Sequence, residues 1–127
     1  MIDVLVLDDQ HSVRQAIVLV AKSLGLTTID FLSGVEALQY LTACTFSTLP
    51  RAYCIDMRIP GPTEELESPL RIYEFLKEKR KVENFYFMTN NLSEHDLEVI
   101  AKTGATAYQK SEIEKIYHHL NSLNAQS

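Results

Sequence analysis

Three aspartates stand directly after apolar segments of the sequence. Asp8 and Asp9 follow residues 2–7, and Asp56 follows residues 52–55. Both segments are short and rich in aliphatic or β-branched residues, which is typical of strands buried on both faces of a parallel sheet. Ligands of such sheets bind in the crevice outside the carboxyl ends of the strands, so these carboxylates are candidates for chemistry. The alternative for Asp56 is a solvated carboxylate at a strand end.

Gathered in one crevice, three carboxylates would repel one another unless a cation were present. Ligands that are all oxygen select a hard divalent ion, and open positions for water and phosphate suit Mg²⁺. Thr89 and Lys110 follow two further apolar segments and would border the same crevice. Their hydroxyl and ammonium groups could bind the oxygens of a phosphoryl group that the metal leaves free.

Five short apolar segments predict strands, and they alternate with five segments whose apolar residues recur at helical spacing. The predicted strands are residues 2–7, 27–31, 52–55, 85–88 and 105–109. Strict alternation predicts parallel pairing with right-handed connections and helices on both faces. We therefore expect an α/β fold of the flavodoxin-like, doubly wound kind, with a five-stranded parallel sheet of order 2-1-3-4-5 and five helices. In this order the first and third strands flank the topological switch point, where Asp8, Asp9 and Asp56 would meet.

Helix boundaries are predicted from serine, proline and glycine. Ser68 before Pro69 fits an N-cap followed by proline at the first helical position. Gly25 and Gly104 are expected to end helices. Residues 60–69 hold three prolines and three glutamates, which predicts an irregular loop. Further helix caps are expected at Ser12, Ser33, Ser93 and Ser111.

Composition bounds the class of protein. Of the 127 residues, 46% are hydrophobic and 23% are charged, which are ordinary values for a globular domain. We expect one domain over residues 1–127, with its core at about residues 2–122 and fraying from residue 121. The formal net charge of −5 gives no general electrostatic reason to bind nucleic acid. The sequence holds neither an apolar run of membrane-spanning length nor a basic leader, so a cytoplasmic protein is expected.

Several motifs follow one another in a characteristic order. They are Leu7-Asp8-Asp9, residues 56–61, Met88-Thr89, and Gly104-Ala105 followed by Tyr108 and Lys110. In order and approximate spacing this set resembles the receiver domain of two-component response regulators. The resemblance spans about residues 2–122 and implies a signalling switch and not a metabolic enzyme.

The resemblance implies a role for each matching residue. Asp56 would be the phosphoacceptor, a carboxylate nucleophile that takes a phosphoryl group from a phosphohistidine donor. Asp9 would bind Mg²⁺ directly and Asp8 mainly through water, with Asp56 and the backbone carbonyl of Arg58 as further ligands. The ion would neutralise charge and orient an in-line transfer.

Three more residues complete the implied machinery. Thr89 resembles the switch hydroxyl that moves toward the phosphoryl group, and Tyr108 resembles the aromatic residue whose rotamer follows it. Ordinary packing at the sheet edge is the alternative for Tyr108. Lys110 would pair with the acidic cluster before phosphorylation and with phosphate afterwards, so that Asp56, Thr89 and Lys110 form the reacting set.

The sequence departs from the family pattern in three places. Lys110 stands two residues after Tyr108, where the family has three, and no proline follows it. Because side chains alternate along a strand, this spacing aims one of the two differently. Loop 61–69 is longer than usual, and its glutamates would shield the site, form a partner surface or simply be solvated. Asn90 occupies a position that the family keeps small, which restricts access to the acceptor.

We therefore expect a phosphoacceptor of a two-component phosphorelay, which sheds its phosphoryl group by water attack. Between phosphorylation and hydrolysis, the surface formed by its fourth helix, fifth strand and fifth helix would change. The expected partners are a sensor histidine kinase or phosphotransfer protein and a downstream protein. The sequence leaves open whether phosphorylation produces a dimer. No DNA-binding output domain and no enzymatic activity beyond turnover of its own phosphoaspartate are expected.

Two rival functions stay open at this point. The first is a receiver-shaped interaction module that is not phosphorylated, which the displaced Lys110, Asn90 and the acidic loop favour. The second is a Mg²⁺-dependent phosphatase with an aspartyl nucleophile. It would want a second acid two residues after the nucleophile, where this chain has Arg58.

Overall fold

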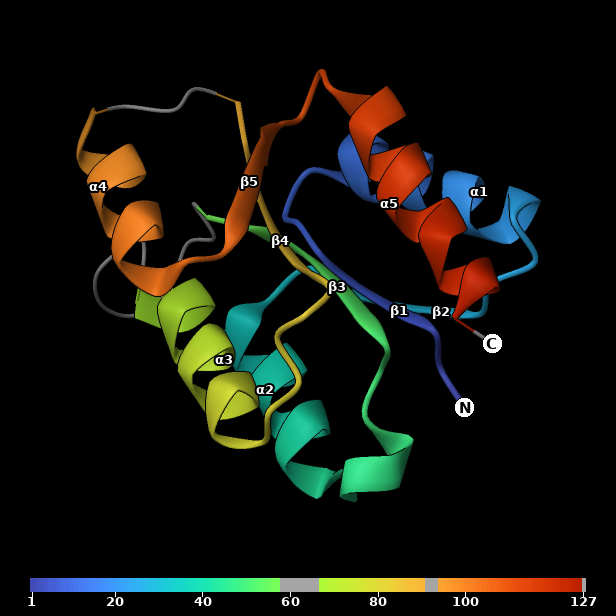
Figure 1. Cartoon of the computed structure of the whole chain (residues 1–127), viewed down its shortest axis with the longest axis horizontal. Coiled ribbons are helices and arrows are strands. Elements are labelled where there is room, and N and C mark those ends of the chain that lie inside the picture. Colours follow the sequence, from blue (N-terminus) through green and yellow to red (C-terminus); the bar gives the residue numbers. More distant parts are fainter. Residues whose placement is uncertain (58–66, 91–93, 127) are drawn as a thin grey trace.

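One parallel sheet organises the molecule. The computed structural model describes residues 1–57, 67–90 and 94–126, with the backbone only at residues 67, 68, 95 and 96. Five strands pair in the order β2-β1-β3-β4-β5 (Figure 1). This confirms the predicted fold class and strand order. The strands are β1 (Val4–Leu7), β2 (Thr28–Phe31), β3 (Ala52–Asp56), β4 (Phe85–Thr89) and β5 (Thr106–Gln109).

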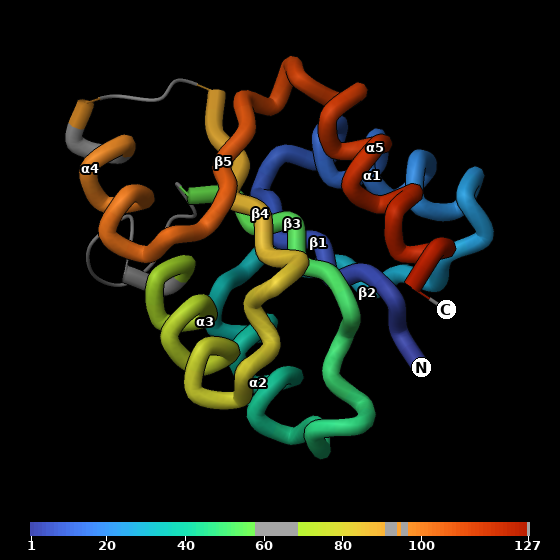
Figure 2. The backbone as a smooth tube through the Cα atoms, viewed as in Figure 1, coloured from blue at the N-terminus to red at the C-terminus, as the bar shows by residue number. Residues whose placement is uncertain are grey.

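Helices cover both faces of the sheet, as Figures 1 and 2 show. One face carries α1 (His11–Ser23) and α5 (Ile113–Ala125). The other carries α2 (Gly34–Ala43), α3 (Glu67–Glu78) and α4 (Glu94–Thr103). A short 3₁₀ helix, η1 (Phe46–Thr48), precedes β3 and was not expected from the sequence. Among the helices that the structure describes, none combines the length and apolar character needed to cross a membrane.

Each face of the sheet has its own core, because successive side chains of a strand point to opposite faces. In β3, Tyr53 and Ile55 pack toward α2 and α3, whereas Cys54 packs toward α1 and α5. Every residue of β1, β3 and β4 is buried, which explains the continuous apolar segments in the sequence. Burial raises the pKa of the free Cys54 thiol to about 12, as expected of a structural cysteine.

Two predicted capping boxes are wrong. The N-cap of α1 is Gln10 and that of α5 is Glu112, so neither Ser12 nor Ser111 caps a helix. The reason at α1 is an interaction that the spacing rule does not consider. The Asp8 carboxylate accepts a hydrogen bond from the Gln10 backbone N–H at 2.8 Å, which turns the chain into the helix earlier.

The predicted start of α3 also needs correction. The helix begins at Glu67, so Ser68 lies inside its first turn and is not the N-cap. Pro69 is tolerated there because first-turn N–H groups lack intrahelical partners. The end of the predicted loop is therefore helical, while residues 60–66 and the cap expected at Ser93 lie outside the described residues.

Other helix boundaries agree with the sequence. Ser33 caps α2 and its hydroxyl accepts from the Glu36 backbone N–H, as predicted. Gly25 and Gly104 both have a φ of 77°, the left-handed conformation that glycine adopts without strain, and they follow the ends of α1 and α4. At the C-terminus, α5 continues to Ala125, through residues that were expected to be frayed.

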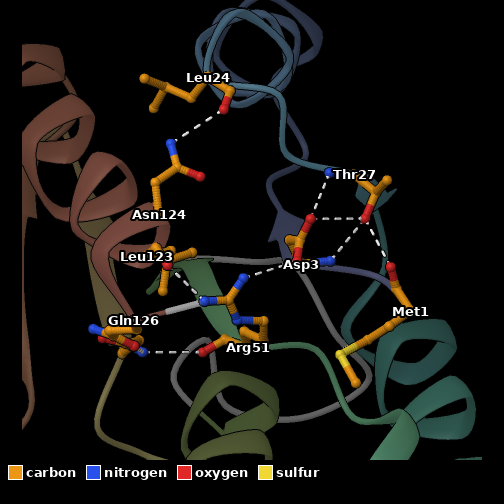
Figure 3. Close-up of polar contacts among 9 residues, drawn as sticks. Met1, Asp3, Leu24, Thr27, Arg51, Leu123, Asn124 and Gln126 are labelled. Carbon is orange, nitrogen blue, oxygen red and sulfur yellow. Dashed lines mark hydrogen bonds and ion pairs between the residues drawn. The ribbon is translucent and has the colours of Figure 1, made fainter.

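The last turns of α5 are tied to the amino-terminal edge of the sheet (Figure 3). Arg51 Nη2 donates to the Leu123 carbonyl at 2.7 Å, and Nη1 lies 3.2 Å from Asp3 Oδ1. The Thr27 backbone N–H donates to Asp3 Oδ2 at 2.9 Å. A guanidinium group at a helix C-terminus also interacts favourably with the helix dipole. These contacts hold α5 in a fixed position relative to β1 and β3.

We predict that Asp3→Asn lowers the free energy of unfolding by about 1 kcal/mol at pH 7. Partial burial acts to raise the pKa of the Asp3 carboxyl, but hydrogen bonds from Thr27 and Arg51 outweigh it and the pKa is lowered. This stabilisation is therefore present above the ordinary aspartate pKa and is lost as the pH falls through the lowered one. Urea unfolding at pH 7 and in acid measures both effects.

Glu98→Gln, on the exposed side of α4, is the control and should leave stability within about 0.5 kcal/mol of the original chain. A difference between Asp3→Asn and the original chain that did not diminish in acid would contradict this account of the network.

Candidate functional site

Asp8, Asp9 and Asp56 meet at the carboxyl edge of the sheet. One carboxylate oxygen of each lies within 4.8 Å of the other two. Asp8 and Asp56 are 0% and 2% exposed, and Asp9 is exposed. The strands β1 and β3 are neighbours, with Leu7 opposite Ile55, so the residues that follow them lie side by side. The predicted convergence of the three carboxylates is confirmed.

Lys110 brings a cation into this cluster. Its Nζ lies 2.9 Å from Asp8 Oδ2 and 3.1 Å from Asp56 Oδ2, and its side chain is only 6% exposed. Burial acts to lower the pKa of the Lys110 ammonium, but the hydrogen bond to Asp8 and the charge of Asp56 outweigh it and the pKa is raised. The ammonium is therefore charged at neutral pH and holds the two buried carboxylates together.

Asp8 also builds the turn that leads into α1. Besides the bond from Gln10 to its carboxylate, the Asp8 carbonyl accepts from Arg14 Nη1 at 2.9 Å. Arg14 Nε in turn pairs with Asp30 Oδ2 on β2 at 2.9 Å. The roles of Gln10 and Arg14 were not expected from the sequence. For Gln10, the one sequence signal of a role at the site was its position directly after the acidic pair. For Arg14, nothing in the spacing indicated a contact with Asp30.

The cluster fits a hard divalent cation. Asp8 Oδ2 is buried, and in the described part of the chain its partner is the Lys110 ammonium, with Nζ at 2.9 Å. A carboxylate oxygen can accept more than one partner, so this atom has capacity for a further ligand. Three carboxylates at one edge provide the oxygen ligands that Mg²⁺ prefers. Arg58, the expected carbonyl ligand, lies outside the described residues.

Thr89 and Tyr108 lie on opposite faces of the sheet. Thr89, the last residue of β4, is 3% exposed and follows Met88, so it shares the face of Phe87. Tyr108 lies opposite Met88 and packs with it in the core under α1 and α5. The Tyr108 hydroxyl is hydrogen bonded to His119 Nε2 on α5. The structure therefore separates the two side chains that the resemblance treats as one switch, and His119 is a contact that the sequence did not reveal.

The short spacing between Tyr108 and Lys110 explains this separation. Residues two apart on an extended chain point to the same face, so Tyr108 follows Lys110 onto the side of α1 and α5. In β5, Gln109 lies opposite Thr89, and Ala107 lies opposite Phe87 and packs in the core on the side of α2 and α3. Of the two residues that the shortened spacing could aim differently, Tyr108 is the one that points to the other face from Thr89, while Lys110 reaches the acidic cluster.

Asn90 borders the site on its solvent side. Its Nδ2 donates to Gln10 Oε1 at 3.4 Å, and the same oxygen accepts from Lys110 Nζ at 2.8 Å. The residue predicted to restrict access to Asp56 thus contacts the start of α1 across the carboxyl edge of the sheet. The side chains of the acidic loop, Glu64, Glu65 and Glu67, lie outside the described residues.

Comparison with known proteins supports the fold. No protein-family model and no curated protein matches the sequence. A response regulator receiver protein from Burkholderia phymatum superposes with a TM-score of 0.69 at 24% identity, over 94% of this chain and 95% of that one. A chemotaxis protein from Vibrio cholerae gives 0.69 at 17% identity, over 94% and 98% of the two chains. A CheY-like receiver domain protein from Methanospirillum hungatei gives 0.66 at 16% identity, over 100% and 99%.

At these identities the likeness establishes architecture. The chain has the fold of a response regulator receiver domain, and the resemblance inferred from its motifs is confirmed at this level. What the site does must still be argued from its own residues.

We predict that Lys110→Met destabilises the protein by about 3 kcal/mol at pH 7, because it leaves two buried carboxylates without their cation. A lysine whose pKa is raised on folding stabilises below its ordinary pKa, and this contribution is lost as the pH rises through the raised value. The loss should therefore be fully present at neutral pH, where urea unfolding measures it.

Lys102→Met, at an exposed position of α4, is the matched control and should change stability by less than about 0.5 kcal/mol. Equal stability of Lys110→Met and the original chain would show that the ammonium does not compensate the buried carboxylates.

Proposed function

We propose that this chain is a phosphoacceptor signalling switch of a two-component phosphorelay, with Asp56 as the acceptor. One observation supports this most strongly. Asp56 is a buried carboxylate at the end of β3 that shares the Lys110 ammonium with Asp8 and lies beside the exposed Asp9. Such an arrangement keeps a nucleophile beside an ammonium that can stabilise the negative charge of a phosphoryl group, and beside carboxylates that can hold a cation.

The proposed reaction rests on these positions and on the resemblance to receiver domains. An Asp56 carboxylate oxygen attacks the phosphorus of a phosphohistidine, the new O–P bond forms as the N–P bond breaks, and the imidazole leaves. Lys110 Nζ, 3.1 Å from Asp56 Oδ2, is placed to move onto an oxygen of the transferred group. The Thr89 hydroxyl, at the end of the neighbouring strand, is the proposed donor to another oxygen. Attack of water on phosphorus later releases inorganic phosphate and restores the carboxylate.

Mg²⁺ is the proposed cofactor of this site. When bound, it would neutralise charge and orient the in-line transfer. Asp9 and Asp8 would hold it together with Asp56, and the Arg58 carbonyl is the further proposed ligand. The observation that supports a cation here is the cluster of three carboxylates, each with an oxygen within 4.8 Å of the other two.

The proposed response surface comprises α4, β5 and α5. Tyr108, two residues before Lys110, contacts His119, so a displacement of the ammonium on phosphorylation would reach α5. Thr89 would transmit the effect of phosphorylation to the face of the sheet that carries α4. The proposed partners are a sensor histidine kinase or phosphotransfer protein and a downstream protein. We propose a single domain over residues 1–127, located in the cytoplasm, whose chemistry is limited to its own phosphoaspartate.

A second candidate function is a receiver-shaped interaction module that is not phosphorylated. The observation that favours it is the contact of Asn90 and Lys110 with the Gln10 side chain, which spans the solvent side of the acidic cluster. Such a bridge would hinder a phosphoryl donor if it did not open.

We predict that Asp56→Asn abolishes covalent phosphorylation by a small acyl phosphate in the presence of Mg²⁺. An amide is not a carboxylate nucleophile, so no acyl phosphate can form at this position. Intact-protein mass spectrometry before and after hydroxylamine, which cleaves acyl phosphates, measures the modification. Asp3→Asn, at the opposite edge of the sheet, should be labelled like the original chain.

Labelling of Asp56→Asn at the original level would refute the assignment of the acceptor. A chain that binds Mg²⁺ but is never labelled would instead support the interaction module.

A further inference from the structure

Gln10 occupies a fixed position between the acidic pair and α1. Its backbone N–H donates to Asp8 Oδ1 at 2.8 Å, and its carbonyl accepts from the Arg14 N–H at 3.0 Å. As the N-cap of α1 it has extended dihedrals, with φ −85° and ψ 112°. The backbone of Gln10 is thus held by a residue of the site on one side and by the helix on the other.

The Gln10 side chain reaches from this position to Lys110. Its Oε1 accepts from Lys110 Nζ at 2.8 Å and from Asn90 Nδ2 at 3.4 Å. Three segments are joined at one oxygen atom, namely the start of α1 and the ends of β4 and β5. Gln10 is exposed whereas the side chain of Lys110 is 6% exposed, so the amide lies on the solvent side of the ammonium.

The number of N–H donors on the lysine ammonium shows what the contact with Gln10 contributes. An ammonium group has three N–H donors. Among the residues that the structure describes, Lys110 Nζ donates to three groups, the carboxylates of Asp8 and Asp56 and the amide oxygen of Gln10. Gln10 therefore supplies the third acceptor, and it is the neutral one. Without it, one N–H would turn to water and the ammonium would be free to rotate about two carboxylate contacts.

We propose that Gln10 is a positioning residue, which holds the Lys110 ammonium between Asp8 and Asp56 and, through Asn90, covers it from solvent. This rests on the proposed function, because the ammonium held there is the one that meets the phosphoryl group. A neutral acceptor suits this task, since it fixes the cation without adding a charge that would repel an incoming phosphate. Gln10 does not itself touch the reacting atoms.

The first measurement uses the unphosphorylated protein without metal. In ¹⁵N-labelled protein, exchange of the Lys110 Nζ protons with water reports how completely the ammonium is hydrogen bonded. Gln10→Ala is expected to speed this exchange roughly tenfold, because one charge-assisted hydrogen bond is lost. Gln10→Glu keeps an acceptor at the same reach and should restore slow exchange. These results do not depend on phosphorylation.

Two further variants separate positioning from general effects. Asn90→Ala removes the cover but leaves the contact between Gln10 and Lys110, so exchange should change less than in Gln10→Ala. Gln15→Ala, an exposed glutamine of the same helix, should behave like the original chain. A purely structural role of Gln10 would change the unfolding midpoint without changing the Lys110 exchange rate.

The second measurement follows the lifetime of phosphorylated Asp56 after labelling with a small acyl phosphate and Mg²⁺. Gln10→Ala should shorten this lifetime severalfold, because water reaches a loosely held site more easily, and Gln10→Glu should not restore it, since its charge repels the phosphoryl group. Exchange at Lys110 that is as slow in Gln10→Ala as in the original chain would overturn the proposal. If Gln10→Ala speeds the exchange but neither the original chain nor any variant can be phosphorylated, the role of Gln10 is supported and the proposed function is refuted.

Discussion

Two buried carboxylates and one ammonium at the carboxyl edge of the sheet set the conditions for the rest of the structure. Removing such charges from water is costly, and only close contact with well-placed partners compensates it. Lys110 meets this condition at 2.9 Å from Asp8 and 3.1 Å from Asp56. The strand order allows the contact, because β1 and β3 are neighbours and the parallel strand β5, next to β4, ends at the same edge of the sheet. The apolar cores on the two faces then position the strands without using any of these charged groups.

The same contact is one reason for the proposal that the response of this protein reaches α5. Once Lys110 points into the acidic cluster, the period of two along an extended chain places Tyr108 on the same face. Tyr108 therefore packs against α5 and binds His119, whereas Thr89 lies on the face of α2, α3 and α4. A change in the charge on Asp56 would act on Lys110 first. Its effect would then reach α5, whose last turns are held against the sheet by Arg51.

The fold and the acidic cluster could be predicted from the sequence because both depend on strong local signals. Buried parallel strands are continuous apolar segments, and an aspartate at the end of one can lie at only one edge of the sheet. The start of α1 could not be predicted, because the Asp8 side chain competes with the capping rule at Ser12. Alternation implies that Lys110 and Tyr108 share a face but does not say which face. The contact between Gln10 and Lys110 joins residues 100 positions apart, and only the folded chain reveals it.

The most direct test of the central claim is the response of the backbone amide NMR spectrum to Mg²⁺ with beryllofluoride, which mimics a phosphoryl group on aspartate. If Asp56 is a phosphoacceptor coupled through Lys110, beryllofluoride will shift the amide signals of Asp56, Thr89 and Lys110, and also those around Tyr108 and His119 in β5 and α5. Binding of Mg²⁺ with no response to beryllofluoride would contradict the claim, and it would identify the chain as an interaction module built on a receiver fold.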